Sequence, residues 1–480
     1  MLRFTHVEQA FPAKREAVVR ADDFAEISPG YLLAKAEEQA SRCLQCGVPF
    51  CQVHCPLQNH IPDWLMLAAE GRLQEAFELS NATSTMPEIC GRICPQDRLC
   101  EGSCVIEQSG HGAVTIGSVE KFITDTAWKE GWVKPLVPLA DRSTQSVGII
   151  GAGPAGLTAA EYLRVQGYDV HVYDRHDRAG GLLTYGIPGF KLEKPIVMRR
   201  IDRLQAGGIH FHLNTEIGRD VSFSALRARH DAVLLATGVY KARETHLAGA
   251  SLQGVVKALD FLIASNRKGF GDAVPEFESG LLDAAGKRVI VIGGGDTAMD
   301  CVRTAVRQGA AQVTCLYRRD RQNMPGSMRE VTHAEEEGVH FEWLAAPTGF
   351  VELGGRVVAM DAMKMRLGHA DVSGRRSPQP EAGSNFRLEA DLVIEALGFD
   401  AEDLPAAFAE PALGVTRWGT VKAESRTLAT SLPGVFAAGD IVRGASLVVW
   451  AIREGRDVAD AVHAWLRARA ARDDLALEAA

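Results

Sequence analysis

The sequence predicts an α/β protein in which two Rossmann-like dinucleotide-binding domains follow a mainly helical N-terminal domain. Two observations lead to this prediction. A short apolar strand that runs directly into a glycine-rich turn and a helix occurs twice, with the turns starting at Gly151 and Gly293. Eight of the ten cysteines lie between Cys43 and Cys104, ahead of both turns, in a stretch with few strand signals.

Length and composition agree with this organisation. At roughly 150 residues per domain, 480 residues are enough for about three domains. The formal net charge is −9 and no basic stripe occurs, which argues against a nucleic-acid partner. No apolar run approaches the roughly 20 residues of a membrane span, and the N-terminus has no apolar segment of the secretory type. We therefore expect a cytoplasmic protein with no membrane association.

Hydrophobic periodicity places the elements in order. Helical spacing covers 29–41 and 61–79, and the proline-containing stretch 133–145 is typical of a linker. The first α/β unit has strands at 146–150, 169–173 and 232–238, and the second repeats them at 288–292, 312–317 and 392–398. A turn and strand at 432–440 and an amphipathic helix at 447–469 end the fold. The expected domains are 1–145, 146–284 (first part of the first dinucleotide domain), 285–405 (second dinucleotide domain) and 406–480 (return to the first).

The first turn has the pattern of a dinucleotide site. Glycines let the backbone approach a pyrophosphate, and the following helix N-terminus favours its negative charge. Asp174 ends the next strand, where its carboxylate can accept hydrogen bonds from ribose hydroxyls. The candidate residues of this turn are Gly151, Gly153, Pro154, Ala155 and Gly156.

The second turn differs at the end of its second strand. Arg318 and Arg319 stand where the first unit has Asp174, and planar, permanently charged guanidinium groups suit a phosphate. This unit is therefore expected to bind NADPH rather than NADH. The candidate residues of this turn are Gly293, Gly294, Gly295, Asp296, Thr297 and Ala298.

Further glycine motifs resemble those of the two-dinucleotide flavoprotein reductases, of the glutathione-reductase and adrenodoxin-reductase type. They are Gly180-Gly181, shortly after Asp174, and Gly439-Asp440 near the C-terminus. The resemblance implies that the first unit binds FAD, with Gly181, Leu182, Gly439 and Asp440 near the flavin nucleotide.

The cysteines give the sharpest signal. They form two groups, Cys43-x2-Cys46-x4-Cys51-x3-Cys55 and Cys90-x3-Cys94-x5-Cys100-x3-Cys104. Eight thiolates are the number that two [4Fe–4S] clusters require. Zinc is the alternative, but zinc sites usually show paired CxxC knuckles and only one CxxC occurs. Disulfides are not expected in the cytoplasm. Cys301 and Cys315 are expected in the core of the second unit, and His54 is expected to be a surface or packing residue and not a metal ligand.

The three groups of motifs belong together electronically. NADPH gives up two electrons together as hydride, whereas an iron–sulfur cluster takes one electron at a time. A flavin can accept the hydride and release single electrons, so it belongs between the two. The protein then mainly positions cofactors, so no catalytic triad is expected and none is found in the sequence.

Taken jointly, the motifs resemble the small (beta) subunit family of bacterial NADPH-dependent glutamate synthases, along nearly the whole chain. The segments that carry the resemblance are 43–51, 90–95, 114–117, 180–188, 323–327 and 444–455. The resemblance implies an electron-input subunit that oxidises NADPH through FAD and two clusters. Its partner would be an FMN-containing large (alpha) subunit, which makes L-glutamate from L-glutamine and 2-oxoglutarate.

The resemblance also implies an interleaved pairing of the cysteines, which spacing alone does not give. One cluster would be held by Cys43, Cys46, Cys51 and Cys104, and the other by Cys55, Cys90, Cys94 and Cys100. Spacing alone suggests 43/46/51/55 and 90/94/100/104.

Two other functions stay open at the sequence level. One is an NADPH:ferredoxin oxidoreductase or a transhydrogenase subunit of the same flavoprotein family, and the other is a zinc-binding scaffold with regulatory nucleotide sites. Glutaminase chemistry is not expected in this chain. Glutamine-hydrolysing amidotransferases of the large-subunit type resemble one another in using an N-terminal cysteine as nucleophile, whereas here Met1 is followed by Leu2 and no cysteine precedes Cys43.

Overall fold

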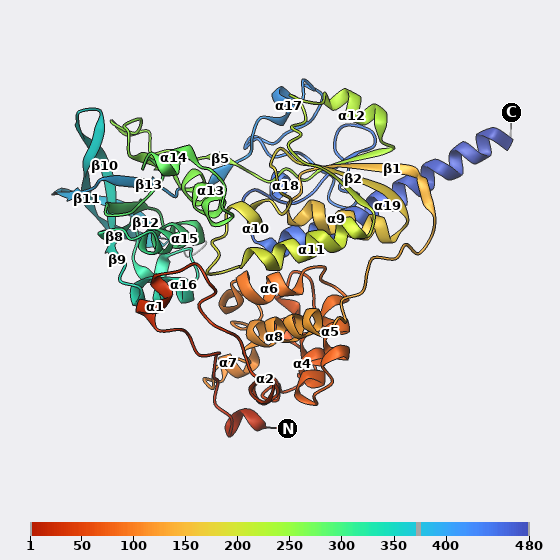
Figure 1. Cartoon of the computed structure of the whole chain (residues 1–480), viewed down its shortest axis with the longest axis horizontal. Coiled ribbons are helices and arrows are strands. Elements are labelled where there is room, and N and C mark those ends of the chain that lie inside the picture. Colours follow the sequence, from red (N-terminus) through yellow and green to blue (C-terminus); the bar gives the residue numbers. More distant parts are fainter. Residues whose placement is uncertain (1, 371–375, 479–480) are drawn as a thin grey trace.

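The protein is described by a computed structural model that covers residues 2–370 and 376–478. Figure 1 shows three parts: a helical N-terminal domain at the bottom, a first α/β unit at the upper right and a second at the left. The long C-terminal helix runs through the first unit and projects beyond it.

The N-terminal domain is helical, and no strand occurs among residues 2–141. The predicted helix at 61–79 is two helices, because Gly71 adopts a positive φ of 74° between them. Trp64, Val119 and Ile123 lie in the core of this domain. Its helices are α1 (Ala17–Ala21), α2 (Leu33–Ala40), α3 (Phe50–Val53), α4 (Ile61–Ala69), α5 (Leu73–Asn81), α6 (Pro87–Ile93), α7 (Val105–Gln108) and α8 (Ile116–Lys129).

The first α/β unit is a parallel sheet of order β15-β4-β1-β2-β3. Its strands are β1 (Arg142–Ile150), β2 (Tyr168–Tyr173), β3 (Ile209–His212), β4 (Ala232–Leu235) and β15 (Val435–Ala437). Its helices are α9 (Pro154–Val165), α10 (Leu182–Tyr185), α11 (Lys194–Ala206), α12 (Phe223–Arg229), α17 (Leu404–Ala407), α18 (Asp440–Arg443) and α19 (Val448–Glu478). β1 starts within the predicted linker, and α19 extends past the predicted end at Arg469.

The second unit repeats this topology as β6-β13-β7-β8-β9. Its elements are β6 (Val255–Lys257), α13 (Ala258–Gly269), α14 (Pro275–Glu278), β7 (Arg288–Ile292), α15 (Asp296–Arg307), β8 (Gln312–Tyr317), α16 (Met328–Glu336), β9 (His340–Trp343) and β13 (Leu392–Glu395). The boundary expected at 285 is therefore too late. β6 pairs with β13, which places 255–284 in the second unit, and a three-residue strand gives little sequence signal.

Two β features have no counterpart in the sequence expectations. An antiparallel sheet extends from the second unit through β10 (Ala345–Leu353), β11 (Arg356–Ala370) and β12 (Arg376–Glu389). The second is a two-stranded antiparallel ribbon of β5 (Lys241–Ala242) and β14 (Phe399–Asp400). It lies where the chain passes from the first unit to the second and where it returns.

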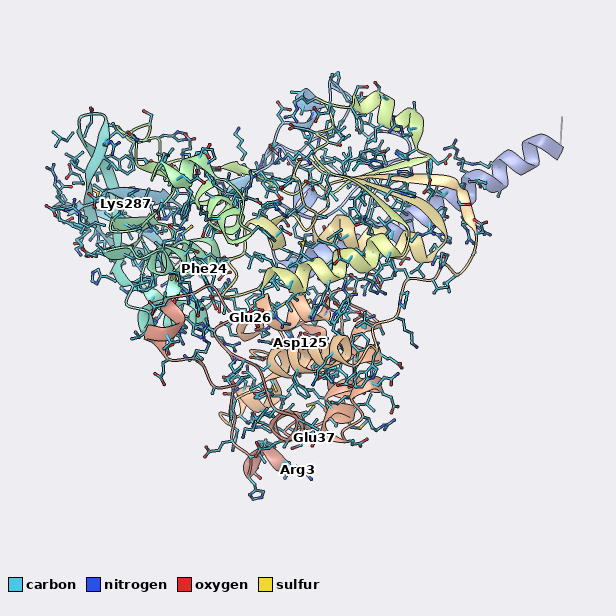
Figure 2. All side chains as sticks on the ribbon, in the orientation of Figure 1. Arg3, Phe24, Glu26, Glu37, Asp125 and Lys287 are labelled. Carbon is cyan, nitrogen blue, oxygen red and sulfur yellow. The ribbon has the colours of Figure 1, made fainter. Side chains whose placement is uncertain are left out.

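The helical domain is docked on the first unit by buried contacts. Arg200 of α11 donates two hydrogen bonds to Glu88 of α6, both at 2.9 Å, and neither side chain is more than 3% exposed. Beside this pair, Arg199 of α11 donates to Asp125 of α8 at 3.0 Å, at the boundary between the two parts (Figure 2). Truncating one partner of such a buried pair typically costs about 3–5 kcal/mol, so the pair fixes the orientation of the two parts.

Among the described residues, no helix combines the length and the apolar character needed to cross a membrane.

Candidate cofactor sites

The three glycines of the first turn differ in how closely other atoms surround them. A Cβ on Gly151 would lie 2.3 Å from the oxygen of Ala236, and a Cβ on Gly156 would lie 2.0 Å from the oxygen of Gly151. A Cβ on Gly153 would meet nothing within 4 Å. The chain's own packing therefore requires the outer two glycines, whereas Gly153 keeps a space open at the N-terminus of α9. A pyrophosphate fits such a space.

Asp174 lies at this turn, as the sequence predicts. Its carboxylate is buried and accepts hydrogen bonds from the backbone N–H groups of Ala152 at 2.8 Å and His176 at 2.9 Å. Burial raises the pKa of Asp174, but the hydrogen bond with the His176 ring, whose Nδ1 lies 2.9 Å from Oδ1, and the two backbone hydrogen bonds together outweigh burial and hold the pKa below the ordinary value. Asp174, Gly151 and Tyr240 line one cavity, so an ionised acceptor faces the space beside the turn.

Gly181 and the start of α10 pack directly on the same turn. A Cβ on Gly181 would lie 2.9 Å from the Cα of Gly153. Behind α10, Lys194 is half-buried and donates to the carbonyls of Leu183, at 3.1 Å, and Ile187. Burial lowers the pKa of Lys194 to about 7. Nothing in the sequence marks this lysine, because a lysine at the start of a helix is ordinarily exposed.

The C-terminal segment reaches the first turn from the other side. Gly439 has a φ of 81°, and a Cβ there would lie 2.9 Å from the Cβ of Ala155. Its N–H donates to Glu454 at 2.8 Å, a residue that the sequence analysis did not predict. Burial raises the pKa of Asp440 to about 6. The structure thus brings together the predicted residues at 151–156, 174, 181–182 and 439–440.

The second glycine turn has the same division of roles. A Cβ on Gly293 would lie 2.3 Å from the oxygen of Ala396, and one on Gly294 would lie 2.3 Å from the ring of Tyr317. A Cβ on Gly295 would meet nothing within 4 Å, so the open space again lies at the N-terminus of a helix, here α15.

Two neighbouring segments complete the second site. Ser327 donates its backbone N–H to Asp296 at 2.9 Å, which holds the segment 323–327 against the turn. Arg318 is exposed and has no hydrogen bond or ion pair within the described residues. Arg319 is buried, and its guanidinium donates to the carbonyl of Arg376 at 3.0 Å. Of the two predicted arginines, Arg318 is the one available to a ligand.

The eight N-terminal cysteines line two separate cavities. The two sets follow the interleaved pairing and not the pairing that spacing alone suggests. One cavity is lined by Cys55, Cys90, Cys94 and Cys100, and the other by Cys43, Cys46, Cys51 and Cys104.

These cysteines fit a metal centre chemically. None of the ten cysteines forms a disulfide. Burial raises the pKa of Cys43 and Cys55 to about 11 and that of Cys51 to about 12. Four buried or half-buried thiols in one cavity can all ionise only if a cation balances their charge, which is what a bound iron centre supplies.

The remaining predictions for cysteine and histidine are confirmed. Cys301 and Cys315 are fully buried in the core of the second unit. His54 is exposed and lines neither cysteine cavity.

The cavity with Cys55 adjoins the first unit. Val449, near the start of α19, lines this cavity together with Cys55. Arg453, one turn further along α19, donates to the carbonyl of Pro56 at 2.7 Å. The other cysteine cavity has no residue of the first unit in its lining.

Comparisons with known proteins agree with this arrangement. A family described as dihydropyrimidine dehydrogenase domain II, 4Fe-4S cluster, matches residues 20–132, and one described as pyridine nucleotide-disulphide oxidoreductase matches residues 145–455. The glutamate synthase (NADPH) small chain of Azospirillum brasilense is 63% identical over 98% of this chain and 97% of its own length. The corresponding chain of Escherichia coli K12 is 46% identical over 97% of this chain and 98% of its own length. The chain belongs to the NADPH-dependent glutamate synthase small-chain family.

Membership of this family confirms the predicted fold class: a helical 4Fe-4S domain precedes two Rossmann-like units. Another relative of the glutamate synthase small chains is the putative oxidoreductase AegA of E. coli K12. It is 46% identical over 95% of this chain and 70% of its own length. A solved structure of Mycobacterium tuberculosis FprA in complex with NADPH aligns with a TM-score of 0.57 at 20% identity. It covers 67% of this chain and 84% of that chain, and at this identity it supports the fold only.

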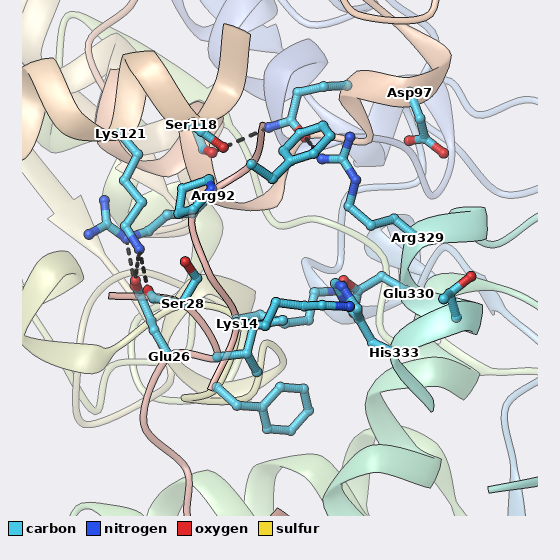
Figure 3. A pocket seen from close by; sticks show the side chains of 18 of the residues that line it. Lys14, Glu26, Ser28, Arg92, Asp97, Ser118, Lys121, Arg329, Glu330 and His333 are labelled. Carbon is cyan, nitrogen blue, oxygen red and sulfur yellow. Dashed lines mark hydrogen bonds and ion pairs between the residues drawn. The ribbon is translucent and has the colours of Figure 1, made fainter. Parts of the chain in front are cut away.

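A large cavity of about 580 Å³ lies where the N-terminal segment, the helical domain and α16 meet (Figure 3). It is lined by no residue of either glycine turn. Charged side chains line it: Glu26 accepts hydrogen bonds from both Arg92 and Lys121, as Figure 3 shows, and Lys191 donates to Asp300 of α15 at 2.9 Å. The Glu26 contacts join segments within the N-terminal part, whereas the contact of Lys191 with Asp300 joins the first unit to the second.

The pKa of Lys194 leads to a testable pH dependence. Between pH 7 and its ordinary value of 10.5, the unfolded chain carries a proton on this lysine that the folded protein lacks. Stability therefore rises with pH over this window, by at most about 1.4 kcal/mol per pH unit. Lys194→Met has no group to titrate, so the stability difference, wild type minus variant, should grow as the pH rises above 7.

Thermal unfolding midpoints of both proteins, measured at several pH values, check this expectation. Lys134→Met, at an exposed position, controls for the loss of any one lysine. Parallel pH profiles for wild type and Lys194→Met would show that the lysine stays charged in the folded protein.

Proposed function

We propose that the chain is the electron-input subunit of an NADPH-dependent glutamate synthase. The first unit holds FAD, the second holds NADPH, and the two cysteine cavities hold one [4Fe–4S] cluster each. Electrons leave to an FMN-containing large subunit, which makes L-glutamate from L-glutamine and 2-oxoglutarate. When bound, FAD accepts hydride and releases single electrons, which the clusters carry onward.

The observation that carries this proposal is the contact between α19 and both neighbouring sites. Val449 lines the cavity of Cys55, and Gly455, less than two turns later, lies against Ala155 of the first glycine turn. A Cβ on Gly455 would be 2.4 Å from the oxygen of Ala155. One helix thus joins the dinucleotide site to a cysteine cavity, so the cavity of Cys55 is the proposed inner cluster site and that of Cys43 the outer one.

The residues of the chain have binding and positioning roles in this scheme. Gly153 and Gly295 leave room for the two pyrophosphates, and Asp174 accepts hydrogen bonds from a ribose of FAD. Glu454 orients the backbone of Gly439 beside the flavin site. In this scheme ammonia chemistry belongs to the large subunit.

A pair of matched variants tests the assignment of the two turns. In Gly153→Ala and Gly295→Ala the new methyl group meets no atom of the protein within 4 Å, so both variants should fold normally. Gly153→Ala should purify with little flavin. Gly295→Ala should keep its flavin but bind NADPH at least about tenfold more weakly, because the methyl group occupies the space of the pyrophosphate.

Flavin content from the visible spectrum and NADPH affinity from titration are the measurements. If Gly295→Ala lost flavin and Gly153→Ala kept it, the two assignments would be reversed.

Arg318 tests the choice of NADPH over NADH. A charge-assisted contact to a phosphate is worth about 1.5–3 kcal/mol, so Arg318→Ala should weaken NADPH binding by about 10- to 100-fold. NADH, which lacks the 2′-phosphate, should be affected less than about threefold. Arg417→Ala is the control, since Arg417 is exposed and stacks only on Trp418.

Steady-state kinetics with each nucleotide measure the effect. If Arg318→Ala lowered kcat/KM equally for NADPH and NADH, Arg318 would not be the residue that recognises the 2′-phosphate.

A further inference from the structure

A row of histidines lies on the first sheet, on the face turned away from α9 and α11. Alternation along β2 sends Val170 and Val172 into the core that α9 shares. Asp169 and His171 therefore point to the opposite face. His210 on the edge strand β3 is the register partner of His171, so both imidazoles and the carboxylate lie on one side of two adjacent strands.

The three side chains converge. His171 Nε2 lies 3.0 Å from Asp169 Oδ2, and His210 Nε2 lies 3.4 Å from Asp169 Oδ1. The two imidazoles stack with 4.8 Å between ring centroids. One possible ligand atom from each of the three residues lies within 4.8 Å of the other two. These residues line neither cysteine cavity.

These separations suit a shared metal ion. Zinc binds histidine nitrogen and carboxylate oxygen at about 2.0–2.2 Å, and ligand atoms at bond angles near 90–110° are then roughly 3.0–3.4 Å apart. Two histidines and one carboxylate are also a donor set that divalent transition metals accept in proteins. His210 is 57% exposed, so the ion has a path from solvent and room for water as a further ligand.

A second layer of contacts holds the inner histidine in the binding orientation. His171 Nδ1 is 2.9 Å from His212 Nε2, and His212 in turn stacks on Tyr173 at 4.5 Å. A hydrogen bond on one ring nitrogen leaves the other nitrogen aimed at the metal, which is the usual outer arrangement of a metal-binding histidine.

We propose that Asp169, His171 and His210 form a binding site for a divalent transition metal ion, with zinc as the reference ion. The ion would link β2 to the edge strand β3. These strands lead directly to the dinucleotide site, because Asp174 follows β2 and its N–H donates to the carbonyl of His212 at 3.0 Å. Metal binding therefore stabilises the sheet edge that carries Asp174. This site is independent of the electron-transfer function proposed above.

The test is isothermal titration of Zn²⁺ into untagged protein whose flavin and clusters are already in place. Wild type should bind one equivalent of zinc and show a higher thermal midpoint when it is bound. His210→Ala and Asp169→Asn should each weaken binding at least about tenfold, since two ligands alone hold the ion poorly.

The second unit supplies a matched control. His340 lies on β9, the edge strand of the second sheet, with Glu342 at 3.9 Å, and residues 2–370 and 376–478 supply no third ligand there. His340→Ala should leave zinc affinity unchanged.

Cu²⁺ EPR on the same proteins identifies the ligands, with coupling to two imidazole nitrogens in wild type and to fewer in His210→Ala. Absence of saturable zinc binding in wild type, or equal affinity in wild type and His210→Ala, would overturn the proposal. In that case the histidine row is a hydrogen-bonded and stacked surface only.

Discussion

The arrangement of the cofactor sites depends on the close contact of the C-terminal segment with Ala155. Gly439 and Gly455 both approach this residue so closely that a Cβ on either would come within 2.9 Å of it. Through these contacts α19 packs on α9, and residues some 300 positions apart form one site. The same helix continues to the inner cysteine cavity through Val449. Any side chain at either glycine would push apart the elements on which the first dinucleotide site and its connection to the cysteines depend.

The second constraint is electrostatic. Three parts of the chain meet along buried or half-buried ion pairs, among them Arg200 with Glu88 and Lys191 with Asp300. A buried charge without its partner is costly, so each pair tolerates only a narrow range of relative positions. Electron transfer between cofactors needs a fixed geometry more than it needs reactive side chains, and these pairs supply that geometry.

Much of the fold and site could be predicted because the signals are local. A strand followed by a glycine turn and a helix identified both α/β units, and the eight cysteines identified the helical domain as a metal-binding domain. The predicted start of the second unit at residue 285 is wrong, because β6 belongs to that unit only through its pairing with β13, which the sequence does not reveal. The antiparallel sheet and Glu454 were missed, because their roles arise from tertiary contacts. Arg318 and Arg319 look equivalent in sequence, and only burial distinguishes the free side chain from the engaged one.

The central claim is that reducing power enters at the second glycine turn and reaches the cysteine cavities through the first. Anaerobic stopped-flow mixing of the isolated holoprotein with NADPH tests this most directly. The flavin absorbance should bleach within the enzyme's turnover time, and an EPR signal from reduced clusters should develop only afterwards. A flavin that stays oxidised while NADPH is bound, or clusters that are reduced before the flavin, would show that electrons do not take this route.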